Sequence, residues 1–304
     1  MSIYTTASAL PRSKSGRNQK QSSPSSWDFE LAKETLLAIE RYDDITEVDR
    51  KDVIVAENVM LDTFVKFSQK DPELPVKICL QDGKILVREL PSQIHGLVAG
   101  TVIHELQPYT NLLLRSTDID IIVGPRSLYR PDASFKPRGL PIPPLQQACD
   151  SAGNAYPTMV VEIGDTQSLN SLHERVYKYF SARTTIQIYL AIKIFPRLND
   201  PFALLALLYQ RNNTNPTIPT QVISFGTAPI ANVTTGFLRN IGTPLPPTGG
   251  HNLCTTANMP AFQLQIPSNL LFHGVPGNVL GGLPATFHLD LFLVLNVLRN
   301  TLPR

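Results

Sequence analysis

Hydrophobic residues recur along the chain with two spacings, and each spacing predicts a different element. Residues 92–109, SQIHGLVAGTVIHELQPY, carry apolar positions three or four apart, as in a helix with one buried face. Residues 168–182 repeat this spacing behind a capping serine and predict a second helix. Apolar residues run almost without interruption in 156–163, YPTMVVEI, and in 184–195, which indicates strands covered on both faces.

Turn signals add further strands to this pattern. Asp82-Gly83 lies between two apolar runs in residues 76–90 and predicts a β-hairpin. Residues 111–135 supply strands separated by polar breaks, and 201–210 are expected to pair with the strand at 184–195 as a hairpin. Together these elements predict an α/β protein (α+β mixed) with a mixed central sheet flanked by helices.

Composition divides the chain into three parts. Residues 1–26 hold four of the basic residues and no acid, and we expect a disordered, solvated tail, with nuclear import or phosphate binding as the alternative. Residues 27–210 form the predicted α/β domain. Residues 211–304 contain eleven of the 26 prolines and no lysine, so we expect an extension packed on the core through short strands, ending in a helix near 288–300. A partner-binding surface is the alternative.

Charge and apolar run length limit the classes of function. Residues 27–304 carry 23 basic and 25 acidic residues, which is too balanced for a protein that holds long duplexes through phosphate contacts alone. The three cysteines are far apart and predict neither a zinc site nor a disulfide framework. The longest apolar runs are too short to span a bilayer, so we expect an intracellular, soluble protein with no membrane partner. Cytoplasm and nucleus are not distinguished.

Two carboxylates occupy positions that call for a partner. Glu162 stands at the end of the apolar strand MVVEI, where an uncompensated charge is costly to bury, and Asp132 follows a proline in YRPDASF. Two carboxylates on neighbouring strands make an oxygen-rich site that suits Mg²⁺. The rival interpretation is a structural carboxylate paired with Arg175 or Arg130.

The order of these motifs resembles the PD-(D/E)XK nuclease superfamily, and in particular the Uma-type restriction-endonuclease-like domains. The motifs, which span about residues 76–195, are LQDGKILVRELPSQIHGLV, YRPDASF, MVVEIGDTQSL, LHERVYKYF and IQIYLAIKI. The resemblance implies a restriction-endonuclease-like core that hydrolyses phosphodiester bonds of nucleic acid, most readily DNA. It also implies Mg²⁺ or Mn²⁺ held by Asp132 and Glu162.

The sequence departs from the nuclease motif at one position. A lysine normally stands two residues after the glutamate, where this chain has Gly164. The Uma-type branch carries that lysine on the following helix, and there the chain has Arg175, on the flank of the apolar stripe. Lys193, on the next strand, is a second candidate, and Lys178 is expected further out toward solvent. Other candidates for a supporting role are Glu89, His95 and Asp165.

Two functions therefore remain open from the sequence. The first is a metal-dependent DNA endonuclease in which Arg175 or Lys193 replaces the usual lysine. The second is a nuclease fold that has lost catalysis and binds nucleic acid or protein, with Glu162 paired to Arg175. The sequence leaves the oligomeric state open, with a homodimer among the options.

Overall fold

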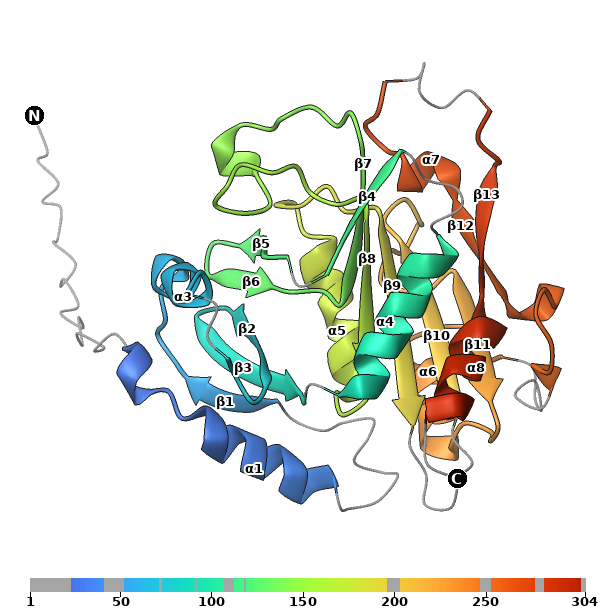
Figure 1. Ribbon diagram of the computed structural model, residues 1–304, viewed down its shortest axis with the longest axis horizontal. Helices are drawn as coiled ribbons and strands as arrows, with labels where there is room; N and C mark the ends of the chain where they lie inside the picture. The colour runs from blue at the N-terminus through green and yellow to red at the C-terminus, as the bar shows by residue number, and fades with distance from the viewer. Residues whose placement is uncertain are drawn as a thin grey trace, which may run out of the picture.

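A six-stranded mixed sheet forms the centre of the protein (Figure 1). The computed structural model describes residues 23–40, 52–70, 73–90, 92–106, 112–117, 119–195, 203–246, 253–276 and 282–301. β8 and β9 are parallel and all other pairs in this sheet are antiparallel. Its strands in spatial order are β11 (Gln221–Gly226), β10 (Ala203–Gln210), β9 (Ile188–Phe195), β8 (Met159–Gly164), β7 (Ala133–Pro137) and β4 (Leu113–Ser116).

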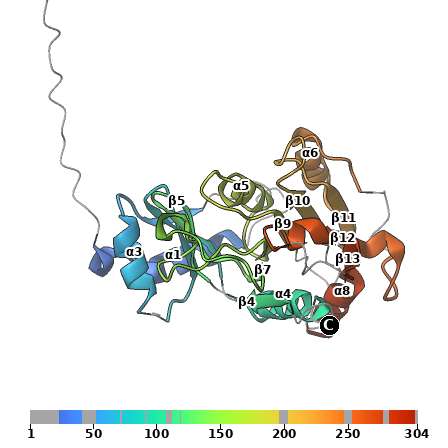
Figure 2. The same ribbon diagram turned by 90° about the horizontal axis from the view of Figure 1, so that it is seen from above.

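Helices cover both faces of this sheet, which is why its central strands are mostly apolar. α4 (Gln93–Glu105) and α8 (Leu291–Thr301) lie on one face, and α5 (Leu169–Tyr179) and α6 (Asn232–Asn240) lie on the other (Figure 2). Every residue of β8 and of β9 is buried. The prediction of strands covered on both faces, with β10 as the hairpin partner of β9, is confirmed.

A second, five-stranded antiparallel sheet packs beside α5. Asp82 and Gly83 make the predicted hairpin turn, with φ of 51° and 81°, values that favour a residue such as glycine. The strands, in spatial order, are β1 (Val53–Ala56), β3 (Lys84–Glu89), β2 (Lys77–Gln81), β6 (Ser127–Tyr129) and β5 (Ile121–Gly124). α1 (Phe29–Glu40) contacts β1, and Phe64 of α3 (Leu61–Ser68) is buried in this part of the core.

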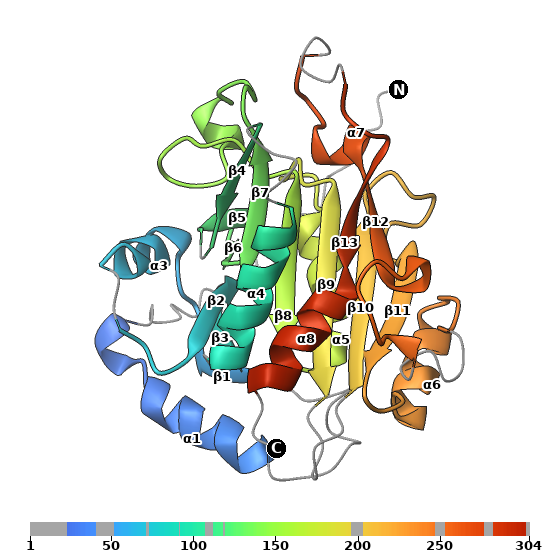
Figure 3. The same ribbon diagram turned by 45° about the vertical axis from the view of Figure 1, so that its right-hand side comes forward.

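The C-terminal part adds a strand pair and a helix to the α4 face of the central sheet. β12 (Gln263–Pro267) pairs antiparallel with β13 (Thr286–Asp290), and both share one hydrophobic core with α4 and α8 (Figure 3). The expected helix begins at Leu291, because His288 belongs to β13. Helices α6 and α7 (Ser268–Leu271) were not expected, and the three-part division of the chain stays a prediction. The short 3₁₀ helices are Pro24–Ser26, Leu145–Gln147 and Pro260–Phe262.

The described part of the chain contains no helix that is both long enough and apolar enough to cross a membrane. The predicted mixed α/β class is confirmed by the sheet topology. The basic tail, residues 1–26, lies outside the described residues up to position 22.

Candidate functional site

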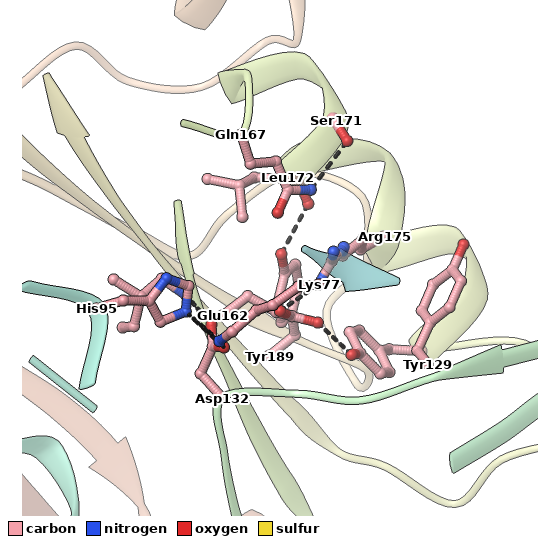
Figure 4. A network of polar contacts seen from close by, with 12 residues as sticks. Lys77, His95, Tyr129, Asp132, Glu162, Gln167, Ser171, Leu172, Arg175 and Tyr189 are labelled. Carbon is pink, nitrogen blue, oxygen red and sulfur yellow. Dashed lines mark hydrogen bonds and ion pairs between the residues drawn. The ribbon is translucent and has the colours of Figure 1, made fainter. Parts of the chain in front are cut away.

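Strand pairing brings the two predicted carboxylates together. Ala133 pairs with Val161, and the backbone N–H of Asp132 donates to the carbonyl of Val161 at 3.0 Å, so that Asp132 lies beside Glu162 (Figure 4). Both residues are buried, with exposed fractions of 4% and 2%. Two adjacent buried carboxylates repel each other, so both need donors or cations nearby.

Asp132 is neutralised from the side of β2 and α4. Its Oδ1 lies 2.5 Å from the Lys77 ammonium and 2.5 Å from Nε2 of His95, and its Oδ2 accepts the N–H of Ile163 at 2.6 Å. The Lys77 nitrogen and His95 Nε2 are 2.8 Å apart. The side chain of Lys77 is 33% exposed, so this half of the site opens toward solvent.

Glu162 is neutralised by α5 alone. Its Oε2 forms an ion pair with Arg175, and its Oε1 accepts the hydroxyl of Tyr179, one helical turn further along. Arg175 also lies over the ring of Tyr129, with 5.6 Å between the guanidinium carbon and the ring centroid. Arg175 and Tyr179 are both buried, so this half of the site is sealed from solvent.

The two environments move the carboxyl pKa values in opposite directions. Burial by itself raises the pKa of Asp132, but the charges of His95 and Lys77 and the hydrogen bond from Ile163 outweigh it, and the pKa lies below its usual value. Burial raises the pKa of Glu162, and Arg175 offsets only part of this effect while Asp132 adds to it. The Glu162 charge in turn raises the pKa of Arg175, which stays a cation.

Helix packing explains the glycine that interrupts the nuclease motif. A Cβ atom on Gly164 would lie 2.5 Å from Cδ1 of Leu172 and 3.3 Å from the carbonyl oxygen of Gln167. α5 therefore crosses β8 too closely to leave room for a lysine side chain there. The lysine of the nuclease motif is therefore excluded from this position by the packing of α5 against β8.

The other predicted cations lie elsewhere. Lys193 pairs in register with Gly164, and its ammonium donates to the carbonyl oxygen of Asp165 at 2.7 Å. Lys178 donates to both carboxylate oxygens of Asp82 in the hairpin turn, at 2.9 and 2.8 Å, which lowers the pKa of Asp82. Of the three basic candidates, the structure brings Arg175 to Glu162.

Of the residues predicted to have a supporting role, His95 lies in the site and Asp165 lies outside it. His95 contacts Asp132 directly, as described above. The carboxylate of Asp165 accepts the hydroxyl of Ser92, the N-cap of α4, at 3.1 Å, and so ties the β8–α5 loop to the start of that helix. Glu89 ends β3, and its side chain lies outside the part of the chain that the structure describes.

Two contacts of the site were missed by reading the sequence. Lys77 reaches Asp132 across 55 residues of chain, and no local pattern marks it. Tyr179 packs in the core, as an aromatic residue on the apolar stripe of a helix would, but its hydroxyl also binds Glu162. The four-residue separation of Arg175 and Tyr179 on one helix face was the signal available for this pair.

The donor set as arranged does not fit a divalent metal ion. All four carboxylate oxygens of Asp132 and Glu162 already receive a hydrogen bond or an ion pair from protein groups. Among the described residues, no group of three or more His, Cys, Asp or Glu side chains is placed to hold a metal. A Mg²⁺ ion here would have to share these oxygens with the cations Lys77 and Arg175, which repel it.

A cavity of about 290 Å³ opens over the Asp132 half of the site. The N-terminal half of α4 forms one wall, and the exposed portion of Lys77 reaches the same space. The lining residues are Lys77, Ser92, His95, Gly96, Ala99, Gly100, Thr117 and Asp132.

The fold and the carboxylate pair define a mixed α/β protein with a buried charged site. No family model matches the chain, and no curated protein matches it. A solved structure described as a candidate nuclease of family DUF820, from Anabaena variabilis, is similar over 60% of this chain and 96% of its own. The two share 14% sequence identity with a TM-score of 0.39.

Proposed function

We propose that this protein is a nuclease-like domain that binds nucleic acid and does not cleave it with a metal ion. The observation that carries the proposal is the neutralisation of both carboxylates by side chains of the same chain. Lys77 and His95 lie on Asp132, and Arg175 and Tyr179 bind Glu162. A metal ion that approaches either carboxylate would meet the repulsion of the cation already bound there.

The Asp132 half of the site has a partly exposed cation beside a cavity, as a binding site for an anion requires. Lys77 is one third exposed and lines the cavity, whereas Asp132 beneath it is compensated by three donors. The nearby start of α4, a helix of 13 residues, adds positive partial charge. A local anion site of this kind agrees with a chain whose overall charge is nearly balanced.

Oligonucleotide binding with matched lysine variants tests the proposal. Anisotropy of a labelled oligonucleotide should report binding to the wild type, weakened about tenfold or more by Lys77→Met. Lys84→Met is the control, because Lys84 pairs with the exposed Glu57 outside the site and its loss should change affinity little. Absence of binding by the wild type, or equal losses in both variants, would refute the proposal.

A second candidate is a phosphodiesterase that depends on Mg²⁺ or Mn²⁺, with Arg175 or Lys193 in place of the usual lysine. The convergence of Asp132 and Glu162, together with the exposure of Lys77, favours it. It predicts that plasmid DNA is nicked with either metal and that Glu162→Ala abolishes nicking. Equal background from the wild type and the variant would exclude it, and cleavage gained by Arg175→Lys would show that little else separates the two functions.

A further inference from the structure

The wall of the Asp132 cavity contains two glycines inside a helix. Gly96 and Gly100 are one turn apart on α4, and both line the cavity with the N-cap residue Ser92. A glycine in a helix interior costs about 0.5–1 kcal/mol relative to alanine. α4 therefore carries this loss of helix stability at two positions of the same cavity wall.

Packing within the protein does not require these glycines. A Cβ atom added to Gly96 or to Gly100 meets no atom of the described residues within 4 Å. Gly164 is different, because there Leu172 fills the space in front of the glycine. The room in front of α4 is therefore available to a ligand that approaches the helix backbone over Lys77.

The lining of the cavity indicates which part of a nucleic acid fits. A base stacks on an aromatic side chain, and among the described residues that line the cavity the only ring is the buried imidazole of His95, held against Asp132. Lys77 and Thr117 instead offer an ammonium and a hydroxyl, groups that contact phosphate and sugar. At about 290 Å³ the cavity is at the small end for ligand sites and suits one backbone unit.

We propose that the sugar-phosphate backbone of a nucleic-acid strand lies against the glycine wall of α4, with one phosphate on Lys77. This inference rests on the proposed function and specifies its ligand contact. It makes Gly96 and Gly100 positioning residues, since any larger side chain would fill the space of the strand. Free phosphate would share the Lys77 contact but not the contact with the wall.

The test places larger side chains at Gly96 and Gly100 and leaves every charged group unchanged. The double variant Gly96→Gln/Gly100→Gln should bind a labelled single-stranded oligonucleotide about tenfold more weakly than the wild type. Its melting temperature should equal or exceed that of the wild type, because glutamine is the better helix former. Gly236→Gln in α6 is the matched control, since a Cβ there also meets nothing within 4 Å in the part of the chain that the structure describes, and it should leave affinity unchanged.

The outcomes separate this inference from the proposed function. If the wild type binds no oligonucleotide, the proposed function fails and this inference with it. If the wild type binds and the double variant binds within about threefold, the strand does not use the α4 wall, and only this inference is overturned. Inorganic phosphate binding as tightly as the oligonucleotide would also overturn it, because a single anion would then suffice.

A measurement on the unaltered protein guards against a variant that fails to fold. The oligonucleotide should slow acetylation of Lys77 by a soluble acylating reagent, read by mass spectrometry, while Lys84 reacts at its usual rate. Equal rates at Lys77 with and without the oligonucleotide would overturn the inference.

Discussion

The two carboxylates at the centre of this protein differ in how they are covered, although they lie side by side. Asp132 is neutralised by Lys77 and His95 from two distant elements, beside a cavity. Glu162 is neutralised by two residues of a single helix and is sealed from solvent. One half of the pair is thus enclosed within the fold, while the other lies beside a cavity that the partly exposed Lys77 also lines.

The largest effect is expected on the sealed side. Glu162→Gln removes the only partner carboxylate of the buried Arg175 guanidinium among the described ion pairs, and should lower the free energy of unfolding by about 3–5 kcal/mol. Urea denaturation measures this loss. Glu162→Gln/Arg175→Met removes both charges and should recover most of it, whereas a loss below about 1 kcal/mol in the single variant would mean the pair is not buried as described.

The second largest effect on stability is expected at Gly164, which occupies the position of the motif lysine. Gly164→Ala should destabilise the protein by about 1–3 kcal/mol, because its Cβ meets Leu172 at 2.5 Å. The same substitution made in a Leu172→Ala background should cost less, and the difference is the coupling between the two positions. Equal costs in both backgrounds would show that Leu172 does not block the site.

The opposite pKa shifts predict opposite dependences of stability on pH. The folded protein keeps Asp132 ionised below its usual pKa of 3.8, where the unfolded chain takes up a proton, so stability from Asp132 is lost as pH falls through that range. Glu162 has a raised pKa, so its contribution is present at low pH and declines as pH rises above 4.5.

Unfolding free energies measured against pH test these signs. Asp132→Asn should flatten the acid limb, by at most about 1.4 kcal/mol per pH unit for one proton. Glu162→Gln should remove the opposing slope above pH 4.5. An acid limb unchanged by Asp132→Asn would contradict the lowered pKa.

The smallest effect on stability is expected at the open side. Lys77→Met removes an ammonium that is one third exposed and screened by solvent, and Asp132 retains His95 and the Ile163 N–H. We expect a loss of about 1 kcal/mol in urea denaturation. If Lys77→Met lowered the free energy of unfolding as much as Glu162→Gln does, the open and sealed halves of the site would not differ in their contribution to stability.

Sequence patterns predicted the fold where periodicity is strong. The uninterrupted apolar run around Val160 identified β8, and the Asp82-Gly83 turn fixed the hairpin of the second sheet. The pattern did not show that the strands divide between two sheets, because strand partners are chosen by tertiary packing. For the same reason α6, with few apolar residues, was missed.

The part of the site that depends on local sequence patterns was predictable, and the part that depends on tertiary packing was not. The carboxylate pair followed from Glu162 on an apolar strand, and the alternative pairing with Arg175 followed from helix geometry. Lys77 could not be found, because it meets Asp132 only after β2 has paired with β6 and β7 has paired with β8. The open space before Gly96 likewise depends on neighbours that helix periodicity does not describe.

Titration of the wild-type protein with Mn²⁺ or Mg²⁺ in a calorimeter tests the central claim most directly. If Lys77 and Arg175 occupy the carboxylates, no stoichiometric site should be detected, and Asp132→Asn should give the same baseline. A one-to-one site that Asp132→Asn removes would contradict the claim and support the metal-dependent phosphodiesterase instead.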